Sequence, residues 1–260
     1  DKQARHEVAF SFECYPYQPG STMLNYLLPY DVWSDGPLGA LARMQDPAVR
    51  ACFRAGLEAY PLDLDRITIA WVPGKENSVY QGRTLAEYVA DTGLEPEEAL
   101  FSLLIEERLS VLAVYHEGND EQIEPLLQHD LCVIGSDGIY FDEGIVHPRV
   151  YGTAPRIIGP LVRDRELFSL EEAVAKLSGR SAACYGLADR GTIREGAFAD
   201  LVVFDPQTVT DRATYEDPHQ TAEGIALVVV NGQTILSDGQ PTNQTADDQP
   251  GRFLRYQPSS

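Results

Sequence analysis

Basic side chains are scarce in this 260-residue sequence, in which 20 Lys and Arg stand against 40 Asp and Glu and give a formal net charge of −20. This excess of negative charge repels phosphate backbones and anionic lipid headgroups, which argues against a nucleic-acid or membrane-surface role. The sequence also lacks the run of roughly 20 apolar residues that crosses a bilayer, and the apolar core of a signal peptide. We therefore expect a soluble, cytoplasmic protein that binds neither nucleic acid nor membranes.

Paired cysteines and paired histidines are missing as well. The four cysteines lie far apart and form no CxxC pair, which argues against a structural zinc site and a dense disulfide framework. A buried free thiol is the expectation for each of Cys14, Cys52, Cys132 and Cys184. No HxH or HHK sequence occurs, and surface or capping roles are expected for His6, His116, His129 and His219.

Segments with the character of β-strands are few before residue 140. Runs rich in apolar residues predict three of them, at 7–15, 66–72 and 131–136. The last run is continuously apolar, as in a parallel strand covered on both faces, and it leads into Ser136-Asp137-Gly138, which places a carboxylate at a sharp turn.

Start and stop signals predict four helices in the same part of the chain, at 47–59, 85–92, 96–107 and 121–128. The capping signals are Asp46 before Pro47, the capping box of Thr84 and Glu87 with Gly93 at the other end, and Asn119 or Asp120.

The last third of the sequence changes character from α/β to all-β. A capping box of Ser169 and Glu172 predicts a helix over 170–178 that ends at Gly179. Beyond it, strands are expected at 199–205, 225–230 and 233–236, the last two joined by an Asn231-Gly232 hairpin turn. The expected division is an α/β part over 1–186, an all-β part over 187–256 and a tail over 257–260.

A barrel of eight βα units needs about 250 residues, which this length would permit. Too few strands precede residue 140 to close such a barrel, so the sequence is expected to form part of a fold.

Several motifs, in order along nearly the whole chain, resemble the C-terminal portion of the N-acyl-D-amino-acid deacylase (D-aminoacylase) family of the amidohydrolase superfamily. The narrowest are IGSDG at 134–138, HPRVYGTAPRIIG at 147–159 and DRATYEDPHQTAEGIALVVVNG at 211–232. Further matches are YPYQPGSTML at 15–24, LFSLEEAVAKLSG at 167–179, RGTIREGAFADLVVFDP at 190–206 and PGRFLR at 250–255.

The resemblance implies an α/β fold, namely the last strands of a metal-dependent (β/α)₈ barrel and part of a small β-sandwich. It also implies that residues 22–130 are a helical insertion, acting either as a lid over the site or as a structural insertion packed beside the barrel. The family's HxH pair, its metal-binding cysteine and two later histidines lie upstream of the YPY segment and have no match here. One carboxylate cannot hold zinc, which takes about four ligands, so the chain alone is expected to be inactive.

Asp137 matches the family aspartate that binds the metal or its water and acts as general base and then acid. Its place at the end of an apolar strand agrees with the barrel mouth, where catalytic residues of such barrels gather. The alternative is that Asp137 only caps a turn, because Ser-Asp-Gly is a common turn sequence.

Arg149 resembles the family arginine that grips the substrate carboxylate, for which a planar guanidinium is well suited. Otherwise it would pair with a structural acid such as Asp142 or Glu143. Tyr15 and Ser21 match positions that hydrogen-bond the substrate or its developing oxyanion, although a half-buried tyrosine and a turn serine are equally open readings. Two further residues are expected to have structural roles: His147, which would position the Arg149 loop, and Cys14, which we do not expect to ligate zinc.

These matches together predict part of a Zn²⁺-dependent hydrolase that deacylates N-acyl-D-amino acids by attack of a metal-activated water on the amide. Its partners would be the small-molecule substrate and an upstream segment or second chain that completes the barrel. Two other readings remain open, a related amidohydrolase acting on a cyclic amide or dipeptide and a non-catalytic subunit of such an enzyme.

Overall fold

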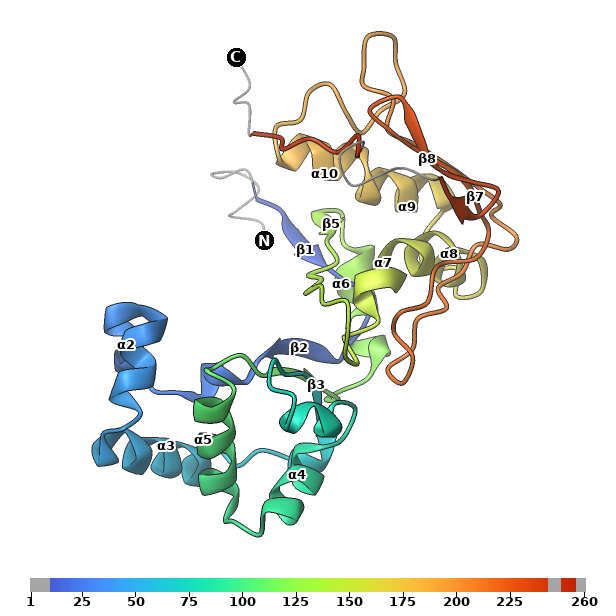
Figure 1. Cartoon of the computed structure of the whole chain (residues 1–260). Coiled ribbons are helices and arrows are strands. Elements are labelled where there is room, and N and C mark those ends of the chain that lie inside the picture. Colours follow the sequence, from blue (N-terminus) through green and yellow to red (C-terminus); the bar gives the residue numbers. More distant parts are fainter. Residues whose placement is uncertain (1–9, 243–248, 256–260) are drawn as a thin grey trace.

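The computed structural model describes residues 10–242 and 249–255 (Figure 1). The start of the predicted first strand at 7–9, His6 and the predicted tail at 257–260 lie outside these ranges. Among the described residues, no helix combines the length and the apolar character that a membrane span requires.

In the described part of the chain, the strands form three separate sheets. Strands β1 (Phe12–Cys14) and β5 (Cys132–Ile134) form a parallel pair, with Phe12 opposite Cys132 and Cys14 opposite Ile134. The second sheet is antiparallel in the order β2-β4-β3, and the third is antiparallel in sequence order from β6 to β9. Their bounds are β2 Gly20–Met23, β3 Ile67–Trp71, β4 Leu112–Tyr115, β6 Leu201–Phe204, β7 Ile225–Val230, β8 Gln233–Ser237 and β9 Gln240–Pro241.

The helices form two groups, one on either side of the β1–β5 pair in the sequence-coloured view (Figure 1). The first group comprises α2 Gly36–Arg43, α3 Pro47–Ala59, α4 Leu85–Thr92 and α5 Pro96–Glu106, with 3₁₀ turns at Leu24–Leu27, Tyr30–Asp35, Leu64–Arg66 and Asn77–Tyr80. The second comprises α6 Glu124–Gln128, α7 Arg149–Ile158, α8 Pro160–Arg163, α9 Leu170–Leu177 and α10 Gly179–Cys184, with a 3₁₀ turn at Asp120–Gln122.

Local signals explain the helices that the sequence predicts. The Asp46 carboxylate accepts a hydrogen bond from the Ala48 N–H, and Pro47 occupies the first turn of α3. At α4 the predicted capping box is complete, because Thr84 and Glu87 each accept the other's backbone N–H, and Gly93 ends the helix in the left-handed region. These local bonds satisfy groups that a helix end leaves without partners.

The three-stranded sheet is buried on both faces. Ile69 and Ala113 face the core formed with α2–α5, whereas Ala70, Leu112 and Val114 face a second cluster that includes Val146 and Val150. The sheet therefore connects the helices of the first group to the segment between β5 and α7. The prediction of only three strands before residue 140 was wrong, because β2 and β4 had been missed.

Three smaller predictions also need correction. Gly179 does not cap the helix predicted over 170–178; α9 ends at Leu177, the backbone turns sharply at Ser178, and α10 begins at Gly179. The helix expected at 121–128 is divided into a 3₁₀ turn and the short α6. Cys52 and Cys184 are exposed free thiols and not buried ones, whereas Cys132 is buried and Cys14 is half-buried.

The mixture of helices and strands confirms the predicted α/β class. A third core covers the β1–β5 pair with side chains from α6, α7, α8 and α9, among them Leu127, Ile157, Leu161 and Ala173. The divisions at residues 186 and 256 remain predictions.

Candidate functional site

A fully buried arginine lies at the start of α7. The Arg149 side chain is 1% exposed, and its Nη2 donates to the Ser21 carbonyl oxygen at 3.0 Å and pairs with the Asp137 Oδ2 at 2.7 Å. The atoms Nε and Nη1 have no hydrogen-bond partner among the described residues. Burying such donors without partners costs about 1–3 kcal/mol each, so the folded chain holds an incompletely satisfied cation here.

Asp137 occupies the turn that follows β5. Its backbone φ is 46°, in the left-handed region, and the adjacent Gly138 N–H donates to the Ser136 hydroxyl at 3.3 Å. Its side chain is 60% exposed, in contrast with that of its partner Arg149. A non-glycine residue in this region is strained by about 1–3 kcal/mol, and such strain gathers at functional sites. Asp137 is therefore a turn residue, and its strained backbone is also compatible with a functional role.

Tyr15 and Ser21 both lie beside Arg149, but they contact it in different ways. The Tyr15 ring faces the guanidinium, with the Arg149 Cζ 4.3 Å from the ring centroid. Ser21 contributes its backbone carbonyl, while its buried hydroxyl donates to the Ala113 carbonyl oxygen across the β2–β4 pair at 2.9 Å. The structure therefore brings together all four residues predicted for the site, and the Ser21 hydroxyl already has a partner in the sheet.

His147 fixes the backbone that leads into Arg149. Its Nδ1 accepts from the Arg149 N–H at 3.0 Å, and its Nε2 is 2.9 Å from the Pro19 carbonyl oxygen. Because a carbonyl can only accept, Nε2 must carry the proton, and the ring is the neutral tautomer. Burial, followed by the charge of Arg149, lowers the pKa of His147 from 6.5 to about 3.

The structural acids predicted as alternative partners of Arg149 do not pair with it among the described residues. Its ion pair is with Asp137, not with Asp142 or Glu143. The Cys14 thiol donates to the Tyr15 carbonyl oxygen at 3.4 Å, and burial raises its pKa, which disfavours the thiolate that binds zinc. Within residues 10–242 and 249–255, no group of three or more His, Cys, Asp and Glu side chains is placed to hold a metal ion.

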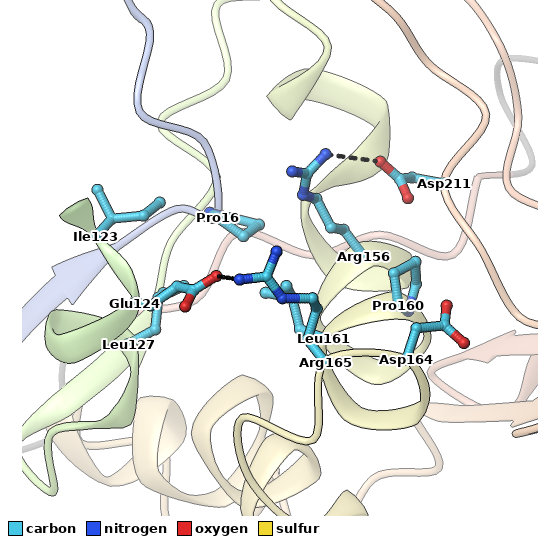
Figure 2. Close-up of a pocket in the computed structure, with 10 residues that line it drawn as sticks. All are labelled: Pro16, Ile123, Glu124, Leu127, Arg156, Pro160, Leu161, Asp164, Arg165 and Asp211. Carbon is cyan, nitrogen blue, oxygen red and sulfur yellow. Dashed lines mark hydrogen bonds and ion pairs between the residues drawn. The ribbon is translucent and has the colours of Figure 1, made fainter. Parts of the chain in front are cut away.

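A second polar cluster, which the sequence analysis did not predict, lies next to this site. The Tyr17 hydroxyl donates to the Asp211 Oδ2 at 3.1 Å, and the Arg156 guanidinium lies 4.4 Å from the Tyr17 ring centroid. Arg156 and Asp211 also line a cavity of about 390 Å³ between α6, α7 and α8, where Arg165 pairs with Glu124 (Figure 2). Asp211 belongs to the narrow DRATYEDPHQ motif, which is the signal that could have drawn attention to it.

Gly152 allows Tyr17 to approach α7. A Cβ atom at this position would lie 2.2 Å from the Tyr17 hydroxyl and 3.1 Å from the Asp211 Cβ. We expect Gly152→Ala to lower the free energy of unfolding by about 1–3 kcal/mol, because overpacking exceeds the gain in helix propensity of about 1 kcal/mol. Chemical denaturation measures this change.

The matched control is Gly56→Ala in the last turn of α3, where an added Cβ meets nothing within 4 Å. Only the propensity term acts there, so this variant is expected to be more stable by up to about 1 kcal/mol. Stabilisation by both substitutions would contradict the close contact between Gly152 and Tyr17.

Comparison with known families identifies the class of protein to which this architecture belongs. The model of the amidohydrolase family Amidohydro_3 matches residues 92–236, which is more than half of the chain and includes Asp137 and Arg149. The chain therefore belongs to the amidohydrolase family.

Within that family, the relatives found are deacylases of N-acyl-D-amino acids, as the motifs predict. From Alcaligenes xylosoxydans xylosoxydans, the D-aminoacylase is 36% identical over 96% of this chain and 42% of its own length. The N-acyl-D-aspartate deacylase of the same organism is 38% identical over 73% of this chain and 36% of its own length. The chain thus spans about two fifths of the length of these relatives.

The solved structures similar to this chain are also those of N-acyl-D-amino-acid deacylases. The N-acyl-D-glutamate deacylase from Bordetella bronchiseptica, complexed with zinc and a phosphonate that mimics the tetrahedral intermediate, has a TM-score of 0.73 and 30% identity. It is matched over 98% of this chain and 44% of its own. A D-aminoacylase structure has a TM-score of 0.69 and 34% identity, over 94% and 43% of the two chains.

Proposed function

We propose that this chain is the substrate-carboxylate-binding part of a zinc-dependent hydrolase that deacylates N-acyl-D-amino acids. The observation that carries the proposal is the pairing of Arg149 with Asp137, in which two nitrogen atoms of a buried guanidinium, Nε and Nη1, have no partner among the described residues. Relatives with deacylase activity and a zinc-bound solved structure support the same conclusion.

Arg149 fits the carboxylate that every N-acyl amino acid carries. A guanidinium binds a carboxylate best through two parallel bonds, which come either from Nε–H and Nη2–H or from Nη1–H and Nη2–H. The atoms Nε and Nη1, which have no hydrogen-bond partner among the described residues, can each supply one bond of such a pair, and Nη2 supplies the other. Burial strengthens this attraction, since water does not compete for the same donors. Tyr15 holds the guanidinium plane from one face, and the Ser21 carbonyl holds its Nη2.

Asp137 fits one position in a zinc centre, because a carboxylate is one of the oxygen ligands that zinc accepts. The described residues do not complete the ligand set, and we assign the remaining ligands to an upstream segment or a partner chain. When bound, zinc lowers the pKa of a coordinated water and so supplies hydroxide at neutral pH. Asp137, which is more than half exposed, can accept a proton at its Oδ atoms and return it to the leaving amine.

The ion pair also suggests how metal binding by Asp137 is coupled to carboxylate binding by Arg149. Among the described residues, Asp137 pairs with Arg149 and occupies its Nη2; a competing cation on Asp137 would leave an Nη2–H for the substrate carboxylate. In this proposal Tyr15 and Ser21 line the pocket, and the first helical group with its three-stranded sheet forms the lid. A wall that excludes water would favour the amide hydrolysis.

The test is turnover and zinc content in the whole protein that contains this chain. We expect release of acetate from N-acetyl-D-amino acids, and Asp137→Ala is expected to lower kcat by roughly 10³-fold or more and to reduce bound zinc. The matched control is Asp142→Ala, which removes the same charge from an exposed position five residues away.

The isolated 260-residue chain is expected to show no turnover, because it offers one carboxylate ligand in its described part. Full zinc loading and turnover by the chain alone would contradict the assignment of ligands to another segment. Unchanged zinc content and kcat in Asp137→Ala would contradict the role of Asp137. A protein that binds zinc but hydrolyses neither linear nor cyclic amides would instead support the non-catalytic subunit.

A further inference from the structure

The segment between β6 and β7 crosses from the four-stranded sheet to the Arg149 site. Residues 211–219, here called the strap, contain no helix or strand. Three side chains spaced four residues apart, Asp211, Tyr215 and His219, nevertheless each contact an element that carries the site. Each contact joins residues that lie dozens of positions apart in the sequence.

Asp211 holds the first of these elements. Its carboxylate accepts from the Tyr17 hydroxyl at 3.1 Å and pairs with Arg156 at 3.6 Å, as Figure 2 shows for the second contact. Its side chain is only 11% exposed. Tyr17 follows Tyr15 by two residues, so the strap anchors the segment that brings the Tyr15 ring onto the Arg149 guanidinium.

Tyr215 packs between two imidazoles. Its ring centroid is 5.1 Å from that of His147 and 5.0 Å from that of His116, with interplanar angles of 80° and 69°. Edge-to-face contacts of this kind fix the orientation of a ring. His147 in turn accepts the Arg149 N–H, so Tyr215 supports the backbone from which the guanidinium extends.

His219 holds the loop on the other side of Arg149. Its Nε2 is 2.9 Å from the Gly144 carbonyl oxygen, and its Nδ1 is 3.1 Å from the Tyr151 hydroxyl. The carbonyl requires a proton on Nε2, so Nδ1 accepts from the Tyr151 hydroxyl in the neutral ring. The strap therefore contacts the chain both before Arg149, at Gly144 and His147, and after it, at Tyr151 and Arg156.

We propose that the strap positions Arg149 for the substrate carboxylate, and that Tyr215 is its central positioning residue. The inference rests on the proposed function and adds to it a determinant of specificity that touches no substrate. A misplacement of about 1 Å at such a group costs up to roughly 10²-fold in rate, so support of this kind has a measurable consequence. Because Arg149 recognises only the carboxylate, the strap affects substrates that carry one.

The test compares Tyr215→Leu with Tyr215→Phe. Leucine removes the ring between His147 and His116, whereas phenylalanine keeps it. In the whole enzyme, we expect Tyr215→Leu to lower the ratio of kcat/KM for N-acetyl-D-leucine to that for N-acetyl-D-leucinamide about tenfold, mainly through KM. Tyr215→Phe is expected to keep the ratio within about twofold of the wild type, because the ring contact persists.

Hydrogen–deuterium exchange in the whole protein gives a readout that does not depend on activity. We expect Tyr215→Leu to speed exchange of the Arg149 amide about tenfold, with little change in Tyr215→Phe. The control is Tyr60→Leu at the exposed end of α3, for which we expect no change at Arg149.

The outcomes separate the two proposals. Faster exchange with a reduced carboxylate preference supports the strap, and unchanged exchange and preference in Tyr215→Leu overturn it. An equal loss on both substrates also overturns it, because a general structural role would produce that result. If the wild type hydrolyses no N-acetyl-D-amino acid, those of aspartate and glutamate included, the proposed function fails and exchange at Arg149 alone decides the strap.

Discussion

Arg149→Met should lower kcat/KM for an N-acyl-D-amino acid by about 30- to 5,000-fold without destabilising the protein. Removing one partner of a buried, hydrogen-bonded charge pair costs about 2–5 kcal/mol of binding energy, which corresponds to that range. The fold responds differently, since the Asp137 carboxylate left behind is 60% exposed and remains hydrated. The nitrogen atoms Nε and Nη1, which have no partner in the described part of the chain, disappear as well, so the free energy of unfolding should stay within about 1 kcal/mol or rise.

A neighbouring arginine on α7 provides the matched control. Arg156→Met removes the charge opposite Asp211, whose side chain is only 11% exposed and keeps the Tyr17 hydroxyl as a donor. We expect this variant to lose about 1–2 kcal/mol of stability, because a mostly buried carboxylate loses a countercharge. Urea unfolding together with kinetics tests both variants. If Arg149→Met is the less stable of the two and fully active, then Arg149 is a structural residue.

Stability should fall in acid because of His147. Its pKa is about 3 in the folded chain, against 6.5 ordinarily, so below pH 6.5 the unfolded chain binds a proton that the folded chain excludes. The free energy of unfolding therefore rises with pH between about 3 and 6.5, with a slope of up to about 1.4 kcal/mol per pH unit from this group. Over the whole interval the effect reaches several kcal/mol, since the side chain is 2% exposed.

His147→Gln isolates that contribution, because an amide donates and accepts hydrogen bonds but does not titrate. We expect the variant to be less stable than the wild type at pH 7 and to have the shallower pH dependence between pH 5 and 6.5. Urea unfolding at half-unit pH steps measures the two slopes. Equal slopes would mean that His147 takes up its proton in the folded chain as easily as in water.

The elements that could be predicted from the sequence are those whose signals are local. Helix α4 has the predicted bounds because its capping box and Gly93 satisfy both helix ends within the segment itself. Strand β2 escaped prediction because Gly20 and Ser21 have low strand propensity, and its pairing with Val114 and Tyr115 is formed across the fold. Helix α7 contains Gly152 and Pro155, and its burial against the cores stabilises it despite them.

The candidate site also contains residues that the sequence predicts and contacts that it does not predict. Asp137 and Arg149 could be predicted from motifs, and they form an ion pair in the structure. The partners of their neighbours could not be predicted, because Asp211 meets Tyr17 across 194 residues and His219 meets Gly144 across 75. No periodicity within the strap indicates these contacts, since it has no regular secondary structure. The motif marked the segment, and only the fold shows which surface it contacts.

The most direct test of the account is the preference of the whole enzyme for a free carboxylate, measured with and without Arg149. The account predicts that N-acetyl-D-leucine is preferred over N-acetyl-D-leucinamide by roughly 10²-fold or more in the wild type, and that Arg149→Met brings the ratio of kcat/KM near one. A ratio that is the same in the wild type and in Arg149→Met would contradict the assignment of the buried guanidinium to the substrate.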